Sequence, residues 1–223
     1  MVFNLKSVCS YLEKKELEIK VVISIFFAVG IIGMLVPVAF PIFIRLVPFA
    51  LILSFLALTL FHQNRDNKKS VIVFLSIYLL GFAVEIAGVN TGLIFGDYQY
   101  GNSLGIKFMS TPIIIGLNWL LLVYTSASIF ERFKMPNLAK IVLASSLMLV
   151  YDFILEQVAP KLDMWRFCDD TVPFRNYFVW FMFALILHSL IKIFRINTEN
   201  RLALIVLISQ FVFFIALSLF LKQ

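Results

Sequence analysis

Residues 81–119 read GFAVEIAGVNTGLIFGDYQYGNSLGIKFMSTPIIIGLNW and hold seven of the nine glycines in the protein. The stretch also contains a carboxylate, Glu85, in a run that is otherwise apolar enough to lie in lipid. Glycine lets a backbone turn tightly or approach a ligand closely, and a carboxylate in hydrocarbon is costly unless it has a partner or a function. We therefore interpret this stretch as the centre of a functional site and the rest of the chain as its scaffold.

The composition indicates a membrane protein. Of the 223 residues, 61% are hydrophobic and 14% are charged, whereas about 25% are charged in an ordinary soluble domain. Two cysteines, Cys9 and Cys168, are too few for a disulfide framework, and two histidines, His62 and His188, are too few for a histidine metal cluster. We expect no metal site.

Seven apolar runs predict an all-α fold, a polytopic integral membrane bundle of about seven transmembrane helices that forms one domain over residues 1–223. Arg45 marks the expected turn between the first two helices. The predicted spans are 21–44, 46–62, 70–89, 112–130, 138–157, 176–191 and 202–221.

The basic residues predict the orientation. With these spans, thirteen of the 19 Lys and Arg residues fall on the side of the N-terminus and six on the other. Cytoplasmic loops carry the excess of Lys and Arg, so we expect a cytoplasmic N-terminus and a location in the inner, cytoplasmic membrane. Contact with anionic lipid then explains the net charge of +6, and no nucleic-acid partner is expected.

Polar residues converge on the outer side of this topology. Glu85 lies near the outer end of the third span, and Asp152 and Glu156 lie in the last turns of the fifth, where their i, i+4 spacing places them on one helix face. Asn118 and Trp119 lie two turns down the fourth span. The aromatic-rich loops 90–111 and 158–175 close over the same side.

Purely structural explanations exist for each feature. Asp152 and Glu156 could flank a helix end, Glu85 could bond Asn118 for packing alone, and the loop aromatic residues could form an interfacial belt. His188, deep in the sixth span, is best explained as a satisfied interhelical donor. We favour a site because three separated stretches converge on one leaflet.

Two sequence patterns resemble a known family. EIAGVNTGLIFGDYQYGNSLG (85–105) with PIIIGLNW (112–119) resembles the first signature of the bacterial and archaeal carotenoid hydratases, which include bisanhydrobacterioruberin hydratase and the 1'-hydratases of monocyclic carotenes. The second signature comprises Asp152-x-x-x-Glu156-x-Val158-Ala159, Trp165-x-Phe167, Pro173, Asn176 and Trp180. The resemblance covers roughly residues 70–195, with mild departures at Gln157 and Phe167.

The resemblance implies addition of water to the terminal double bond of an acyclic carotenoid ψ-end, which gives a tertiary alcohol. Protonation of the less substituted carbon leaves a tertiary cation that water captures. A carboxylic acid can donate the proton, a second carboxylate can orient water and accept its proton, and aromatic faces can stabilise the cation. The chemistry needs no cofactor. The implied partners are a substrate resembling lycopene or γ-carotene, the lipid bilayer and other enzymes of the pathway.

We expect Glu85 and Asp152 to act as acid and base, in an order that the sequence leaves open, with Glu156 as their electrostatic partner. Asn118 or Asn176 would orient water. The remaining expected substrate-binding residues are Tyr98, Tyr100, Trp119, Trp165 and Trp180, with Asp97 at the rim.

Two other functions remain open at this point. One is a carotenoid end-group cyclase or another prenyl-lipid membrane enzyme; a cyclase shares the protonation step but lets a neighbouring double bond capture the cation. A proton-coupled carrier would suit buried acids, although the halves show no convincing inverted repeat. A retinal protein is excluded because the seventh run, 202–221, contains no lysine.

Overall fold

The computed structural model describes residues 14–62 and 67–221. Cys9 lies outside this range. Three of the Lys and Arg residues used to predict the orientation also lie outside it, namely Lys6, Arg65 and Lys222. Seven helices within the described residues are long and apolar enough to cross a membrane. The prediction of an all-α membrane bundle is therefore confirmed, and the chain is an integral membrane protein.

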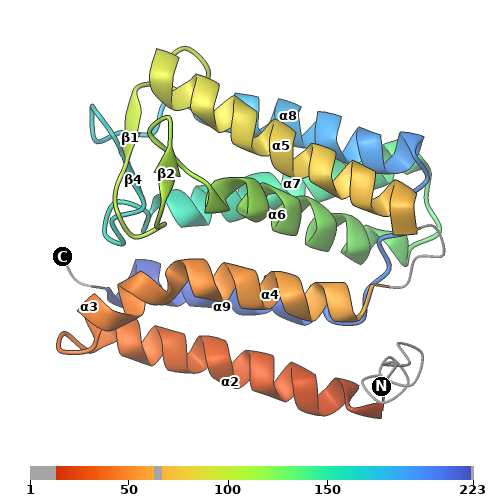
Figure 1. Cartoon of the computed structure of the whole chain (residues 1–223), viewed down its shortest axis with the longest axis horizontal. Helices are drawn as coiled ribbons and strands as arrows, with labels where there is room; N and C mark the ends of the chain where they lie inside the picture. Colours follow the sequence, from red (N-terminus) through yellow and green to blue (C-terminus); the bar gives the residue numbers. More distant parts are fainter. Residues whose placement is uncertain (1–13, 63–66, 222–223) are drawn as a thin grey trace.

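The helices follow the chain in order (Figure 1). Their bounds are α2 (Glu16–Leu35), α3 (Phe40–Phe43), the 3₁₀ turn η1 (Ile44–Leu46), α4 (Val47–Leu60), α5 (Asn67–Thr91), α6 (Ile114–Glu131), α7 (Asn137–Glu156), α8 (Phe174–Ile193) and α9 (Ala203–Phe220). Helices α3, η1 and α4 continue one another and form the second span.

The predicted boundary between the first two spans is wrong. Helix α2 ends at Leu35, and the chain turns over residues 36–39. Pro37 explains this position, because proline disfavours helical backbone at the residue before it and cannot donate a helix hydrogen bond. Val36 is accordingly extended, with φ −90° and ψ 113°. Arg45 lies inside η1 rather than in a turn between spans.

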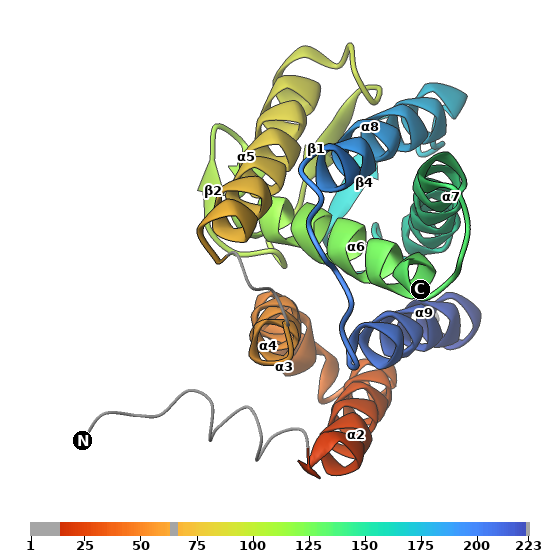
Figure 2. The ribbon, with the colours of Figure 1, turned by 90° about the vertical axis from the view of Figure 1, so that its right-hand side faces the viewer.

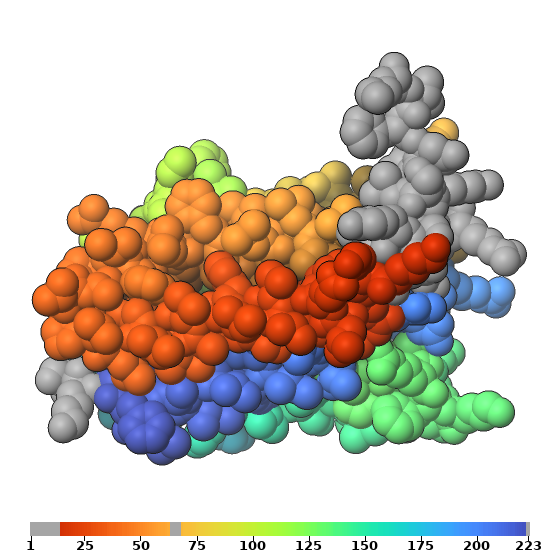
Figure 3. Space-filling view, turned by 90° about the horizontal axis from the view of Figure 1, so that it is seen from below, coloured from red at the N-terminus to blue at the C-terminus, as the bar shows by residue number. Residues whose placement is uncertain are grey.

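Helix α6 forms the centre of the bundle, with α4, α5, α7, α8 and α9 packed around it (Figure 2). It is the most buried of the seven spans. Helix α2 lies outside this group along α9, so that α2, α4 and α9 share one face of the molecule (Figure 3). Large apolar side chains such as Val22, Ile25 and Ile32 are exposed on α2, as expected for a surface that faces lipid.

Two small sheets join the loops at one end of the bundle. Strand β1 (Tyr98–Tyr100) pairs antiparallel with β4 (Trp165–Phe167), and β2 (Lys107–Phe108) pairs with β3 (Thr111–Pro112). The β1–β4 pair ties the loop after α5 to the loop after α7. We call this end, where both loops lie, the strand end; the described N-terminal residues of α2 lie at the opposite end (Figure 1).

Candidate functional site

Glu85 is held by three hydrogen-bond donors. Its Oε2 accepts from the hydroxyls of Tyr98 and Tyr100, both at 2.7 Å, and its Oε1 accepts from the indole nitrogen of Trp119 at 2.9 Å. The side chain is 3% exposed. Since an ionised carboxylate only accepts hydrogen bonds, this arrangement suits the ionised form of Glu85 and fixes its orientation.

The β1 strand aims both tyrosines at Glu85. Side chains alternate along a strand, so Tyr98 and Tyr100 are buried on one face while Gln99 between them is exposed. Burial and the Glu85 carboxyl raise the pKa of both tyrosines above its ordinary value, so both hydroxyls keep the protons that they donate.

Two glycines permit the close approaches that the site needs. A Cβ at Gly81 on α5 would lie 2.6 Å from the Cβ of Trp119, so glycine lets α6 bring the indole to Glu85. A Cβ at Gly101 would lie 2.2 Å from the carbonyl oxygen of Asp163. Glycine there lets the two loops meet, and its N–H bonds Met164 O at 2.8 Å.

Asp152 and Glu156 form a second acidic group on α7. The Asn176 side chain on α8 donates to Asp152 Oδ2 at 3.2 Å and makes a longer contact with Glu156 Oε1 at 3.4 Å. Trp165 donates its indole N–H to Glu156 Oε2 at 3.0 Å. Asp152 is fully buried, and its Oδ1 has no hydrogen-bond partner among the described residues.

Glu85 and Glu156 share one small cavity, which we call the carboxyl cavity. Its volume is about 10 Å³, close to the lower limit for one water molecule. Asp152 does not line it. The lining residues are Glu85, Phe95, Tyr98, Tyr100, Ile115, Glu156, Trp165, Phe167, Asn176 and Trp180.

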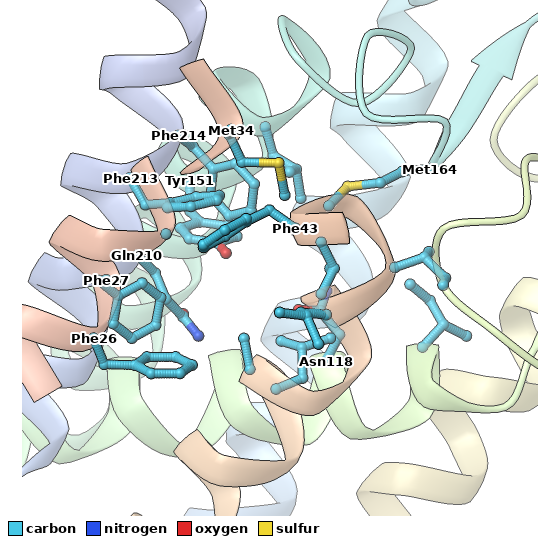
Figure 4. Close-up of a pocket in the computed structure, with 18 of the residues that line it drawn as sticks. Phe26, Phe27, Met34, Phe43, Asn118, Tyr151, Met164, Gln210, Phe213 and Phe214 are labelled. Atoms are coloured by element: carbon cyan, nitrogen blue, oxygen red, sulfur yellow. The ribbon is translucent and has the colours of Figure 1, made fainter. Parts of the chain in front are cut away.

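A larger space, which we call the apolar cavity, adjoins the first. It measures about 300 Å³, lies among α2, α4, α6, α7 and α9, and is lined mainly by aromatic and aliphatic side chains (Figure 4). Ile115 and Trp165 line both cavities and form the partition between them. Exposed residues on α2 and before α4, including Val29 and Leu46, also line it, so the cavity reaches the lipid-facing surface.

The structure brings most of the expected residues together. Trp180 stacks on Trp119 with ring centroids 3.9 Å apart and also lines the carboxyl cavity. Asn118 instead lines the apolar cavity, and Asp97 is exposed beyond the cluster. Glu156, which we expected to be the electrostatic partner, lines the carboxyl cavity together with Glu85, whereas Asp152 does not.

Sequence reasoning missed several lining residues. Phe95, Ile115 and Phe167 line the carboxyl cavity, and Gln210 lines the apolar one. Phe95 and Phe167 lie inside the quoted signatures, but only the structure shows that Phe95 is buried and that Phe167, paired with Tyr98, is buried on the inner face of β4. The sequence could have identified Gln210 as a candidate, because a lone amide in the apolar run of α9 is costly without a partner or a function.

His188 belongs to a separate polar group nearer the middle of the bundle. Its Nε2 lies 2.9 Å from Ser126 Oγ, and its Nδ1 lies 2.8 Å from the carbonyl oxygen of Ala184 and 3.1 Å from Ser145 Oγ. The histidine joins α6, α7 and α8, as expected for an interhelical donor, and lines neither cavity.

Comparison with protein families identifies the family of this chain. The family described as carotenoid biosynthesis protein matches residues 46–223, which cover most of the chain and every residue of both acidic groups. The chain belongs to the carotenoid biosynthesis protein family. Comparison with curated proteins gives no match, and comparison with solved structures gives none either.

Membership of the carotenoid biosynthesis protein family supports a role in making carotenoids, long apolar polyenes that dissolve in lipid. The apolar cavity suits such molecules, because it is lined by apolar side chains and reaches the lipid-facing surface. The match begins at Leu46, so α2, which forms one wall of the apolar cavity, lies outside it.

Proposed function

We propose that the protein is a carotenoid hydratase that adds water to the terminal double bond of an acyclic ψ-end. The observation that carries the proposal is the carboxyl cavity, which is about the size of one water and lies between two carboxyl groups. Hydration requires both a proton donor and a held water molecule at the reacting carbons. The carboxyl cavity has room for the water molecule, and its two carboxyl groups include the proton donor. The neighbouring apolar cavity has room for the polyene.

Glu156 is the proton donor in this proposal. It shares one helix face and one amide, Asn176, with Asp152. Two like charges this close in a buried site repel each other, so the pair holds at least one proton. We assign the donor role to Glu156 because it is the member of the pair that lines the carboxyl cavity, and Asp152 is a positioning residue on the same helix face.

Glu85 is the base. The polyene end reaches the Ile115–Trp165 partition from the apolar cavity, and Glu156 protonates the less substituted alkene carbon there. The tertiary cation is then captured by water in the carboxyl cavity, and Glu85 accepts the water proton. Transfer of that proton back to Glu156 completes the cycle, so the net change is one water added to one double bond.

The aromatic wall stabilises the cation. Tyr100, Trp165 and Trp180 line the cavity together with the acids, and aromatic faces attract positive charge. The bilayer location also fits, because the substrate enters sideways from lipid. We place the enzyme in the cytoplasmic membrane, with the strand end outside, from the distribution of basic residues.

Expression in a host that accumulates lycopene and γ-carotene tests the proposal. New pigments heavier by one water are expected, and Glu85→Gln and Glu156→Gln should each lower their formation by about a hundredfold or more. Glu199→Gln is the matched control, because Glu199 is exposed and distant from both cavities. New isomers of unchanged mass would instead identify a cyclase, and full activity of both site variants would refute the assigned roles.

A further inference from the structure

Two amide side chains stand out in the apolar cavity. Asn118 on α6 is 6% exposed and Gln210 on α9 is 4% exposed, and both line the cavity. Neither side chain makes a hydrogen bond within the part of the chain that the structure describes. Figure 4 shows the Gln210 amide extending into the space beside Phe26 and Phe27, with Asn118 on the side formed by α6.

These amides do not suit a site for a pure hydrocarbon. A buried polar group that faces hydrocarbon loses its hydrogen bonds to water and gains none in return. The remaining wall consists largely of phenylalanine, aliphatic and methionine side chains, which would bind a hydrocarbon without this penalty. A ligand that carries an oxygen can satisfy the amides, since each amide can both donate and accept.

The position of Asn118 places this oxygen relative to the reaction. Asn118 follows Ile115 by three residues on α6, so its Cα lies about 4.5 Å further along the helix axis than the partition. Gln210 lies one turn before Phe213 and Phe214, which also line the apolar cavity. The oxygen therefore belongs to the segment of the ligand behind the reacting end group.

We propose that Asn118 and Gln210 form a subsite for a hydroxyl or carbonyl oxygen carried by the polyene, so that the protein prefers an oxygen-bearing polyene to the parent hydrocarbon. This inference rests on the proposed function for the orientation of the ligand but not for its binding. It implies that a reaction which introduces oxygen into the polyene supplies the preferred substrate.

Binding measurements on the purified full-length protein in detergent test the subsite. Quenching of tryptophan fluorescence reports binding because Trp165 lines the apolar cavity. The two probes are lycopene and a monohydroxylated derivative of the same carbon skeleton, whose hydroxyl lies behind the end group and whose terminal double bonds are intact, so that it is not the hydration product. We expect the wild type to bind the hydroxylated probe about tenfold more tightly, since a site built to bond an oxygen rejects an analogue that lacks it.

Asn118→Leu and Gln210→Met should remove this preference while lycopene binding holds or improves. Asn137→Leu, which changes an exposed amide at the end of α7 opposite the strand end, is the control and should keep the preference. Thermal melting identifies any variant that fails to fold. Equal affinity of the wild type for both probes, or equal losses for both probes in the variants, would overturn the inference, and water molecules would then be the partners of the amides.

The same mixtures separate this inference from the proposed function. Product mass reports hydration, whereas fluorescence reports binding without turnover. Selective binding without any product heavier by one water would refute the hydratase and leave the subsite intact. Hydration without selective binding would refute the subsite and leave the hydratase intact.

Discussion

At the scale of single residues, the two carboxyl groups of the carboxyl cavity differ in their partners. Glu85 accepts from three donors, and all three come from residues buried around it. Glu156 accepts one indole N–H at 3.0 Å and makes a longer contact with an amide shared with Asp152. In our proposal this difference separates the base from the acid, because donors favour the ionised carboxylate and a neighbouring acid favours a retained proton.

The tyrosine hydroxyls test this distinction. Tyr98→Phe and Tyr100→Phe each remove one donor at 2.7 Å from Glu85 Oε2 and preserve the ring. A hydrogen bond to a charged group contributes about 1.5–3 kcal/mol, so we expect each variant to lower kcat about tenfold or more. Kinetics of the purified variants measure the loss.

Tyr177→Phe is the control, because Tyr177 lines neither cavity. If both site variants matched the wild type, Glu85 would not depend on its donors.

Individual residues also show what the sequence could and could not reveal about the site. Glu85, Asp152 and Glu156 were recognisable because a carboxylate in an apolar run is rare and costly. That Glu156, and not Asp152, faces Glu85 depends on how α7 is rotated against its neighbours. Residues at i and i+4 share a face, so their spacing cannot show which of the two carboxyls borders the cavity.

At the scale of elements, the long apolar runs predicted the helices, since each is long enough to cross a bilayer. The first boundary was predicted at Arg45, but the helix ends earlier because Pro37 restricts the backbone at its own position and at the residue before it. The β1–β4 pairing could not be predicted. It joins two three-residue strands with more than sixty residues between them, and such short strands carry little periodic signal.

The contact between α5 and α6 yields an element-scale prediction. A Cβ at Gly81 would lie 2.6 Å from the Cβ of Trp119, whose indole bonds Glu85. Gly81→Ala should therefore separate the helices and lower stability by about 1–3 kcal/mol, with a parallel loss of hydration activity. Thermal unfolding in detergent and product yield are the two readouts.

Ala83→Leu on the same helix provides the comparison, since Ala83 is exposed on the lipid-facing surface. Equal melting temperatures for Gly81→Ala, Ala83→Leu and the wild type would show that the close approach is not required.

At the scale of the whole molecule, the bundle has two different ends. The strand end holds both loops and the carboxyl cavity. The opposite end carries ion pairs, with Glu131 bound to Lys140 and Lys192, and Arg201 bound to Glu16. The excess of basic residues at that end predicts that it faces the cytoplasm, and the organisation of residues 1–223 as one domain likewise stays a prediction.

Cys168 provides a test of the orientation. It is exposed in the loop after β4 at the strand end, so a thiol reagent that does not cross membranes should label it from outside in a Cys9→Ser variant. Its hydrogen bond with Asp97 raises the pKa of the thiol. Labelling should therefore be slow at neutral pH and faster in mildly alkaline buffer, because the thiolate is the reactive form. Labelling only after the membrane is opened would place the strand end inside.

The most direct test of the central claim follows the oxygen atom. Purified protein is incubated with lycopene or its monohydroxylated derivative in water enriched in a heavy oxygen isotope, and the products are weighed by mass spectrometry. The hydratase predicts one heavy oxygen per new hydroxyl in the wild type, with little product from Glu85→Gln and Glu156→Gln. A product without new oxygen, or with oxygen of ordinary mass, would contradict water capture in the carboxyl cavity.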